Sequence, residues 1–155
     1  MSPPDPTTTQ IRRILEAAVH DGFHGFSGMC GQAAVAIDRI LLNGRGEIVG
    51  AFNIAFLARE RHIGHVAVAW NGRYWDADGR PKDVDDILSW GMLDPEDPDY
   101  IEEARLFGFE WTEEAAEEVS LVTLDPARAL TIFGSDALAE LEAILTRARD
   151  EILEP

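Results

Sequence analysis

The sequence predicts a single α+β domain in which helices pack on a small antiparallel sheet. Two of the supporting observations are helical: a run of small and apolar residues begins at Cys30, and residues 135–153 carry Leu, Ala and Ile on one helical stripe. The third is an Asn-Gly pair between Val-rich and aromatic runs at 65–78, which is the strongest short-range signal of a β-hairpin. With 155 residues, 46% of them hydrophobic, the chain is long enough for one core and short for two.

The sequence predicts two helices in the first part of this domain. Residues 1–9 are rich in Pro and Thr and are expected to be a disordered tail, so that the domain covers 10–155. Apolar residues at helical spacing behind a Thr cap predict a helix over 10–20, and "HDGFHGFSG" breaks it. A second helix follows, with Ser27 as its N-cap, Cys30 in its first turn and "NGRG" as its stop.

The remaining segments alternate between strands and helices. Residues 48–60 suit either a helix or a buried strand, and their Ala, Leu, Arg and Glu content favours a helix. The hairpin predicts strands at about 65–70 and 73–78. Short helices are expected at "VDDILSW" and "DYIEEARLFG", a strand at "VSLVTL", and an amphipathic helix over 135–153 that covers the core.

Cysteine usage and hydropathy favour a soluble protein of the cytoplasm. Because Cys30 is the only cysteine, no internal disulfide can form. The first thirty residues lack the basic start and apolar run of a secretory signal, and no apolar run reaches the roughly 20 residues that span a bilayer. A reducing compartment is therefore expected.

The charge balance narrows the class of partner. The formal net charge is −16, with 29 Asp and Glu against 13 Lys and Arg. Nucleic acids and anionic membranes are bound by clustered cations, so neither partner is expected. A basic protein partner stays open, although the acidic runs "DVDDILSWGMLDPEDPDYIEE" and "EWTEEAAEEV" are more typical of solvated surface.

Cys30 is a candidate nucleophile because of its place at the start of a helix. A thiol in the first turn lies near free backbone N–H groups and the positive end of the helix dipole, which favour a thiolate. The same N–H groups could form an oxyanion hole. From this helix alone, packing of a small cysteine beside Ala33 and Ala34 is an equal alternative.

The hairpin favours the catalytic alternative. With Asn71 and Gly72 as the loop of a type I′ turn, His65 faces Asp78 and is one diagonal step from Asp76. A carboxylate beside an imidazole fixes its tautomer and stabilises its charged form. An ordinary cross-strand ion pair is the structural alternative. A cysteine at a helix start in the same chain makes a Cys-His-Asp site the better interpretation.

The motif "HGFSGMC" resembles the nucleophile region of papain-like cysteine peptidases, in which a Gly-x-Cys opens a helix. Gly25, Gly28 and Cys30 match that pattern, and His24 stands where the family has its oxyanion-hole glutamine. "GHVAVAWNGRYWDADG" is similar to the histidine strand and the following Asp or Asn strand of papain-like and transglutaminase-like enzymes and of arylamine N-acetyltransferases. The resemblance covers roughly residues 24–79.

The resemblance implies a papain-like domain with the nucleophile helix packed on the sheet, as in short bacterial or phage-type members. It implies a hydrolase, such as a thiol protease or deamidase, or an acyltransferase that acts on a peptide or glutamine amide. Cys30 would attack, His65 would be the base, and His24 would serve the oxyanion hole. Cross-strand geometry favours Asp78 as the third member and the "DADG" pattern favours Asp76; we expect Asp76 and keep Asp78.

Other site classes are less well supported. No metal or cofactor is expected, because His62 and His65 would point to opposite faces of a strand and "DPEDPD" lacks the glycine and distal glutamate of a calcium loop. A protein or peptide substrate follows from the first interpretation. The alternative function is a non-catalytic acidic protein that binds or inhibits a basic partner by imitating a nucleic-acid backbone.

Overall fold

The computed structural model describes residues 6–24, 29–55 and 63–153, and they form a mixed α+β fold. Its sheet is small, antiparallel and four-stranded, with the order β3-β2-β1-β4. The strands are β1 (Glu47–Asn53), β2 (Ile63–Trp70), β3 (Arg73–Trp75) and β4 (Val119–Leu124). Within the described ranges there are seven helices: α1 (Thr8–His20), α2 (Cys30–Leu41), α3 (Val84–Ser89), α4 (Pro98–Phe107), α5 (Glu113–Glu117), α6 (Pro126–Phe133) and α7 (Leu138–Leu153).

Most of the sequence-based elements are confirmed within a few residues. Helix α1 begins at Thr8, inside the range predicted as a tail, behind a capping box formed by Thr7 and Gln10, and residues 1–5 of that range lie outside the described residues. The second helix has Cys30 as its first residue. Its N-cap is Met29, and the predicted cap Ser27 lies outside the described residues. Helices α5 and α6 were not predicted.

The predicted helix over 48–60 is wrong. This segment forms the central strand β1 as far as Asn53, while residues 56–60 lie outside the described part of the chain. Strand β1 pairs with β2 on one side and β4 on the other, and all its residues after Glu47 are buried. Pairing with a strand on each side and burial of Ile48, Val49 and Phe52 outweigh the local helix preference of the segment.

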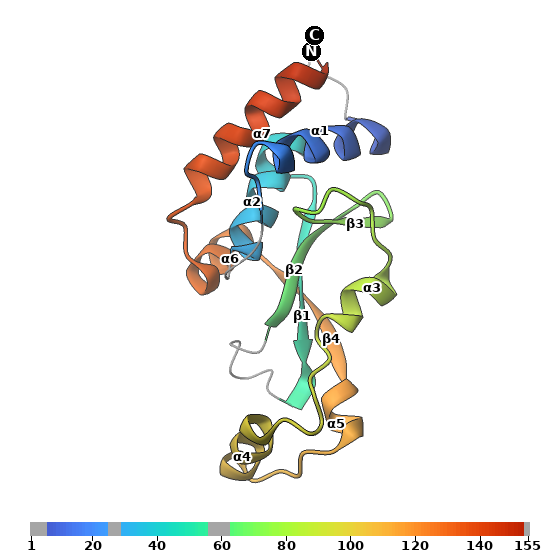
Figure 1. The fold of residues 1–155 in the computed structure, drawn as a ribbon, viewed down its shortest axis with the longest axis vertical. Helices are drawn as coiled ribbons and strands as arrows, with labels where there is room; N and C mark the ends of the chain where they lie inside the picture. Colours follow the sequence, from blue (N-terminus) through green and yellow to red (C-terminus); the bar gives the residue numbers. More distant parts are fainter. Residues whose placement is uncertain (1–5, 25–28, 56–62, 154–155) are drawn as a thin grey trace.

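Helices cover the two faces of the sheet unequally (Figure 1). Helices α1, α2, α6 and α7 gather on one side, and α2 lies alongside β2 and against α6 and α7. Helix α3 lies on the other side, and α4 and α5 extend beyond one end of the sheet. From Gly31 to Asp38 every residue of α2 is buried, as expected for a helix between the sheet and an outer layer.

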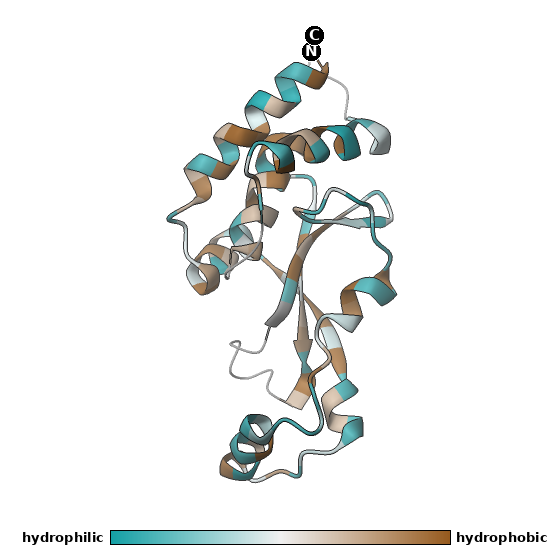
Figure 2. Cartoon of the chain, viewed as in Figure 1, coloured by the Kyte–Doolittle hydropathy of each residue, from teal (hydrophilic) through white to brown (hydrophobic). Residues whose placement is uncertain are grey.

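The main core fills the space between the sheet and the larger helix layer. Strand β2 contributes Val66 and Val68, and Trp75 at the end of β3 is fully buried. A smaller cluster on the opposite face contains Ala51, Ala67 and Ile87. Figure 2 shows apolar residues along β1 and β4 and alternating apolar and polar segments along α7, which is typical of a helix with one buried stripe.

Gln32 connects the start of α2 to the turn between α6 and α7. Its Nε2 donates to the backbone oxygen of Phe133 at 3.2 Å and to Asp136 Oδ1 at 3.0 Å, and its Oε1 accepts from Ala137 N at 2.8 Å. The residue is 1% exposed. A buried amide with three partners fixes the first turn of α2, where Cys30 lies.

Replacement of Gln32 by alanine should lower the free energy of unfolding by roughly 1–3 kcal/mol, because the Ala137 N–H loses its buried acceptor. Urea unfolding followed by circular dichroism measures the change. The control Glu140→Ala, at an exposed position of α7, should stay within about 0.5 kcal/mol of the parent chain. Equal effects of the two variants would contradict the assigned role of Gln32.

Candidate active site

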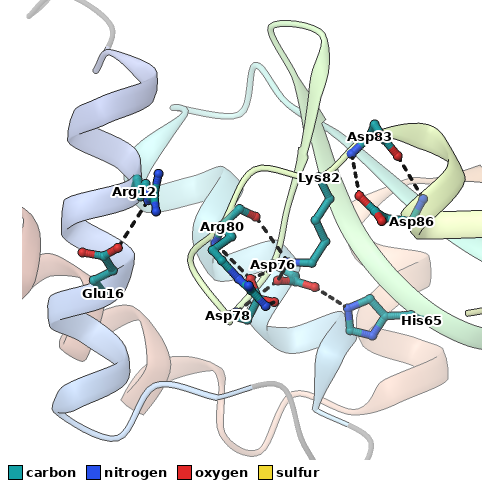
Figure 3. Close-up of polar contacts among 9 residues, drawn as sticks. All are labelled: Arg12, Glu16, His65, Asp76, Asp78, Arg80, Lys82, Asp83 and Asp86. Carbon is teal, nitrogen blue, oxygen red and sulfur yellow. Dashed lines mark hydrogen bonds and ion pairs between the residues drawn. The ribbon is translucent and has the colours of Figure 1, made fainter.

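His65 and Asp76 form a hydrogen-bonded pair at the edge of the sheet. His65 lies on β2, and Asp76 is the first residue after β3. The distance from His65 Nε2 to Asp76 Oδ2 is 2.8 Å, and the two side chains are 24% and 9% exposed. Figure 3 shows the imidazole and the carboxylate pointing toward each other. Nε2 is therefore engaged, and Nδ1 is the ring nitrogen left for another partner.

Two local features of the sheet bring this pair together. Asn71 and Gly72 have φ values of 53° and 75°, as a type I′ turn requires, and Val68 pairs with Trp75 in the register that this turn sets. The register between β1 and β2 shifts next to His65, where Ala51 pairs with His65. Such a bulge bends a strand and redirects the neighbouring side chain.

The predicted register beyond Trp75 is wrong. Strand β3 ends there and does not continue to residue 78, because the Asp76 side chain accepts a hydrogen bond from Asp78 N at 3.0 Å and turns the chain. Asp78 therefore does not face His65 across a ladder: its carboxylate contacts Lys82 and Arg80. Of the two candidate aspartates, Asp76 is the one that contacts the imidazole.

Lys82 is the second partner of the Asp76 carboxylate. Its Nζ lies 2.9 Å from Asp76 Oδ1, while Oδ2 faces His65. Burial by itself raises the pKa of Asp76, but the hydrogen bonds from His65 and Lys82 and the charge of Lys82 hold that pKa well below its usual range. Asp76 is therefore ionised at neutral pH.

Cys30 is the first residue of α2, half-buried and packed against the main core. The next residue, Gly31, lies against α6: a Cβ at this position would lie 2.4 Å from the ring of Phe133, so a larger residue would require Phe133 to move. Phe133 thereby fixes the depth of the helix start. Met29 caps the helix without a side-chain hydrogen bond, so the first N–H groups of α2 point out of the helix end beside Cys30.

The pKa of His65 depends on the burial of the imidazole and on the groups beside it. Burial opposes protonation, but the hydrogen bonds and negative charges of Asp76 and Cys30 outweigh it and raise the pKa to about 9. His65 thus interacts with a carboxylate and with the thiol. Below about pH 9 the ring is an imidazolium.

Sequence reasoning missed two neighbours of the pair. Trp90 lies edge-on to His65, with ring centroids 4.0 Å apart at an interplanar angle of 76°, and Lys82 Nζ lies 5.6 Å from the Trp90 centroid. Both residues also line a pocket of about 410 Å³ that includes Asp86 and Ser89. Trp90 was one of four tryptophans in the sequence, and no local pattern separates it from Trp75 in the core.

The other predicted site residues are less closely defined. His24 is half-buried in the segment after α1, and its predicted role in an oxyanion hole stays a prediction. Gly25 and Gly28, which carry part of the family resemblance, lie outside the described residues, as does His62.

Among the residues that the structure describes, no three His, Cys, Asp or Glu side chains gather as a metal site would need. None of the described helices is both long and apolar enough to cross a membrane.

Comparison of the chain with family models, with curated proteins and with solved structures gave no match.

Asp76→Asn should lower the pKa of His65 from about 9 toward its ordinary value, because a neutral amide cannot stabilise the imidazolium. Titration of the labelled imidazole by NMR measures this directly. Asp78→Asn is the matched control, since its carboxylate contacts Lys82 and Arg80, and it should leave the His65 pKa nearly unchanged. The assignment would be contradicted by an equal decrease in both variants.

Proposed function

We propose that this protein is a papain-like cysteine hydrolase or acyltransferase that uses Cys30, His65 and Asp76 as a triad. The observation that carries the proposal is the 2.8 Å contact between Asp76 Oδ2 and Nε2 of His65, a ring whose pKa is raised by Asp76 and by the thiol of Cys30. A nucleophile, a base and a group that orients the base are the three parts of such a site.

The reaction begins with attack of the Cys30 thiolate on a carbonyl carbon of a peptide bond or of a glutamine side-chain amide. The C–S bond forms as the carbonyl π pair moves to oxygen. The C–N bond then breaks as the His65 imidazolium gives its proton to the leaving amine, which produces a thioester on Cys30 and a neutral imidazole. Asp76 keeps the ring in one tautomer and orientation throughout.

The thioester is resolved by a second nucleophile. Neutral His65 takes a proton from water or from an amine as this molecule attacks the thioester carbon, and the C–S bond breaks to restore the thiolate. Water gives a protease or deamidase, and an amine gives an acyltransferase. In both steps the negative oxygen is stabilised by backbone N–H groups at the start of α2, with His24 as a further donor in this proposal.

Iodoacetamide should modify Cys30 at about pH 6 at least tenfold faster in the parent chain than in His65→Ala, because protonated His65 favours the thiolate. The rates are measured by intact-mass spectrometry. His20→Ala is the matched control, since His20 is an exposed histidine at the end of α1, and it should react like the parent. A parent rate as low as that of His65→Ala would contradict the proposal.

A substrate screen tests the reaction itself. Acyl-fluorogenic peptides, glutamine amides, and acyl donors with arylamine acceptors should include at least one compound that the parent chain turns over and that Cys30→Ala does not, because the thiolate carries the acyl group. Cys30→Ser keeps the size of the side chain and should lose about as much activity. Turnover that persists in both variants would assign the activity to another site.

A non-catalytic acidic binding protein is the second candidate, and the charge distribution favours it. Residues 83–118, which include α3, α4 and α5, carry 14 of the 29 acidic residues and one arginine, Arg105. A surface of this kind attracts a basic partner. This candidate has no need of a reactive thiol, so slow alkylation of Cys30 together with no Cys30-dependent turnover would favour it over the triad.

A further inference from the structure

Lys82 lies behind the His65–Asp76 pair, and each of its three ammonium protons has an acceptor. Nζ donates to Asp76 Oδ1 at 2.9 Å, to Asp78 Oδ1, and to the backbone oxygen of Arg80 at 3.3 Å. The side chain is 11% exposed. All three acceptors belong to the turn that leads from Asp76 to Lys82, so the ammonium holds this turn closed (Figure 3).

The backbone of Lys82 is fixed as well. Tyr74 N donates to Lys82 O and Lys82 N donates to Tyr74 O, both at 2.9 Å, which attaches Lys82 to the outer side of β3. The turn therefore leaves the strand at Asp76 and returns to the same strand at Lys82. A side chain anchored in this way can hold the Asp76 carboxylate in one rotation.

The two oxygens of the Asp76 carboxylate bind different cationic partners. Lys82 and the Asp78 N–H bind Oδ1, which directs Oδ2 to Nε2 of His65. Lys82 also lies over Trp90, whose ring meets the imidazole edge-on. Lys82 thus contacts Asp76 and Trp90, and both of these side chains contact His65.

We infer that Lys82 is a positioning residue: it holds the Asp76 carboxylate and the Trp90 ring against His65 and so directs the imidazole toward Cys30. The inference rests on the proposed function for its catalytic consequence. A positioning role and a purely electrostatic role of Lys82 would have opposite effects on the pKa of His65. A cation near His65 disfavours the imidazolium, so its charge alone would lower the pKa of His65, whereas holding Asp76 in place raises it.

Lys82→Met keeps the length of the side chain and removes the ammonium. We expect kcat to fall about tenfold or more with little change in KM, because the base is misdirected and substrate binding is not. The alkaline limb of the activity profile should move to lower pH by roughly one unit, since a released Asp76 no longer supports the imidazolium. Lys82→Arg should recover much of both, because it restores a donor cation.

Arg80→Met is the matched control. Arg80 provides a cation in the same turn, but its side chain contacts Asp78, is 73% exposed and has no contact with Asp76 among the interactions of the described residues. The alkaline limb should stay in place in this variant. An alkaline limb that is unchanged or moves to higher pH in Lys82→Met would overturn the positioning role. If Lys82→Met does not fold, Lys82→Gln is measured with the same criteria.

NMR titration of His65 separates this inference from the proposed function. If no substrate shows Cys30-dependent turnover, the proposed function fails, but the pKa of His65 in Lys82→Met still decides the role of Lys82. A decrease relative to the parent supports positioning of the pair, and an unchanged or increased value overturns it. Circular dichroism checks that each variant is folded before titration.

Discussion

The hydrogen bond between His65 Nε2 and Asp76 Oδ2 is the interaction on which the rest of the site depends. It joins the inner strand β2 to the turn that follows the edge strand β3. The imidazole also meets the ring of Trp90, and the charge-assisted hydrogen bond to the carboxylate is the directional contact that orients it. The carboxylate engages Nε2 and leaves Nδ1 available to another partner.

The surrounding structure supports this pair in two layers. Asp76 is almost fully buried, and a buried carboxylate needs compensation, which it receives from His65, Lys82 and the N–H of Asp78. On the other side, Phe133 and Gln32 fix the start of α2 and thereby the place of the thiol. Residues far apart in the sequence thus meet around one small group of side chains.

The site could be predicted from the sequence only in part. The Asn-Gly turn and the alternation of β2 placed His65 near two aspartates, and the glycine-rich helix start singled out Cys30. The register failed after Trp75 because the Asp76 side chain forms its own turn, which pattern reasoning treated as continued strand. Lys82 was missed for the same reason: its contacts exist only where that turn closes.

For the fold as well, elements with a distinct sequence pattern were predicted and elements with an ambiguous pattern were not. The amphipathic segment at 135–153 was recognised because its apolar stripe is long, and α7 begins at Leu138. Strand β1 was mistaken for a helix because it is buried on both faces and shows no alternation. The sequence of helix α6 contains signals of a helix start, with Asp125 as N-cap and Pro126 in its first turn. It was not predicted because the helix is only eight residues long.

The most direct test of the central claim is detection of an acyl group on Cys30. The parent chain is mixed with p-nitrophenyl acetate, quenched in acid at short times and analysed by intact and peptide mass spectrometry. The account predicts an acetyl adduct that forms on Cys30, decays with time, and is absent from Cys30→Ser and greatly slowed in His65→Ala. An adduct confined to lysines, or one on Cys30 that forms equally fast without His65, would contradict it.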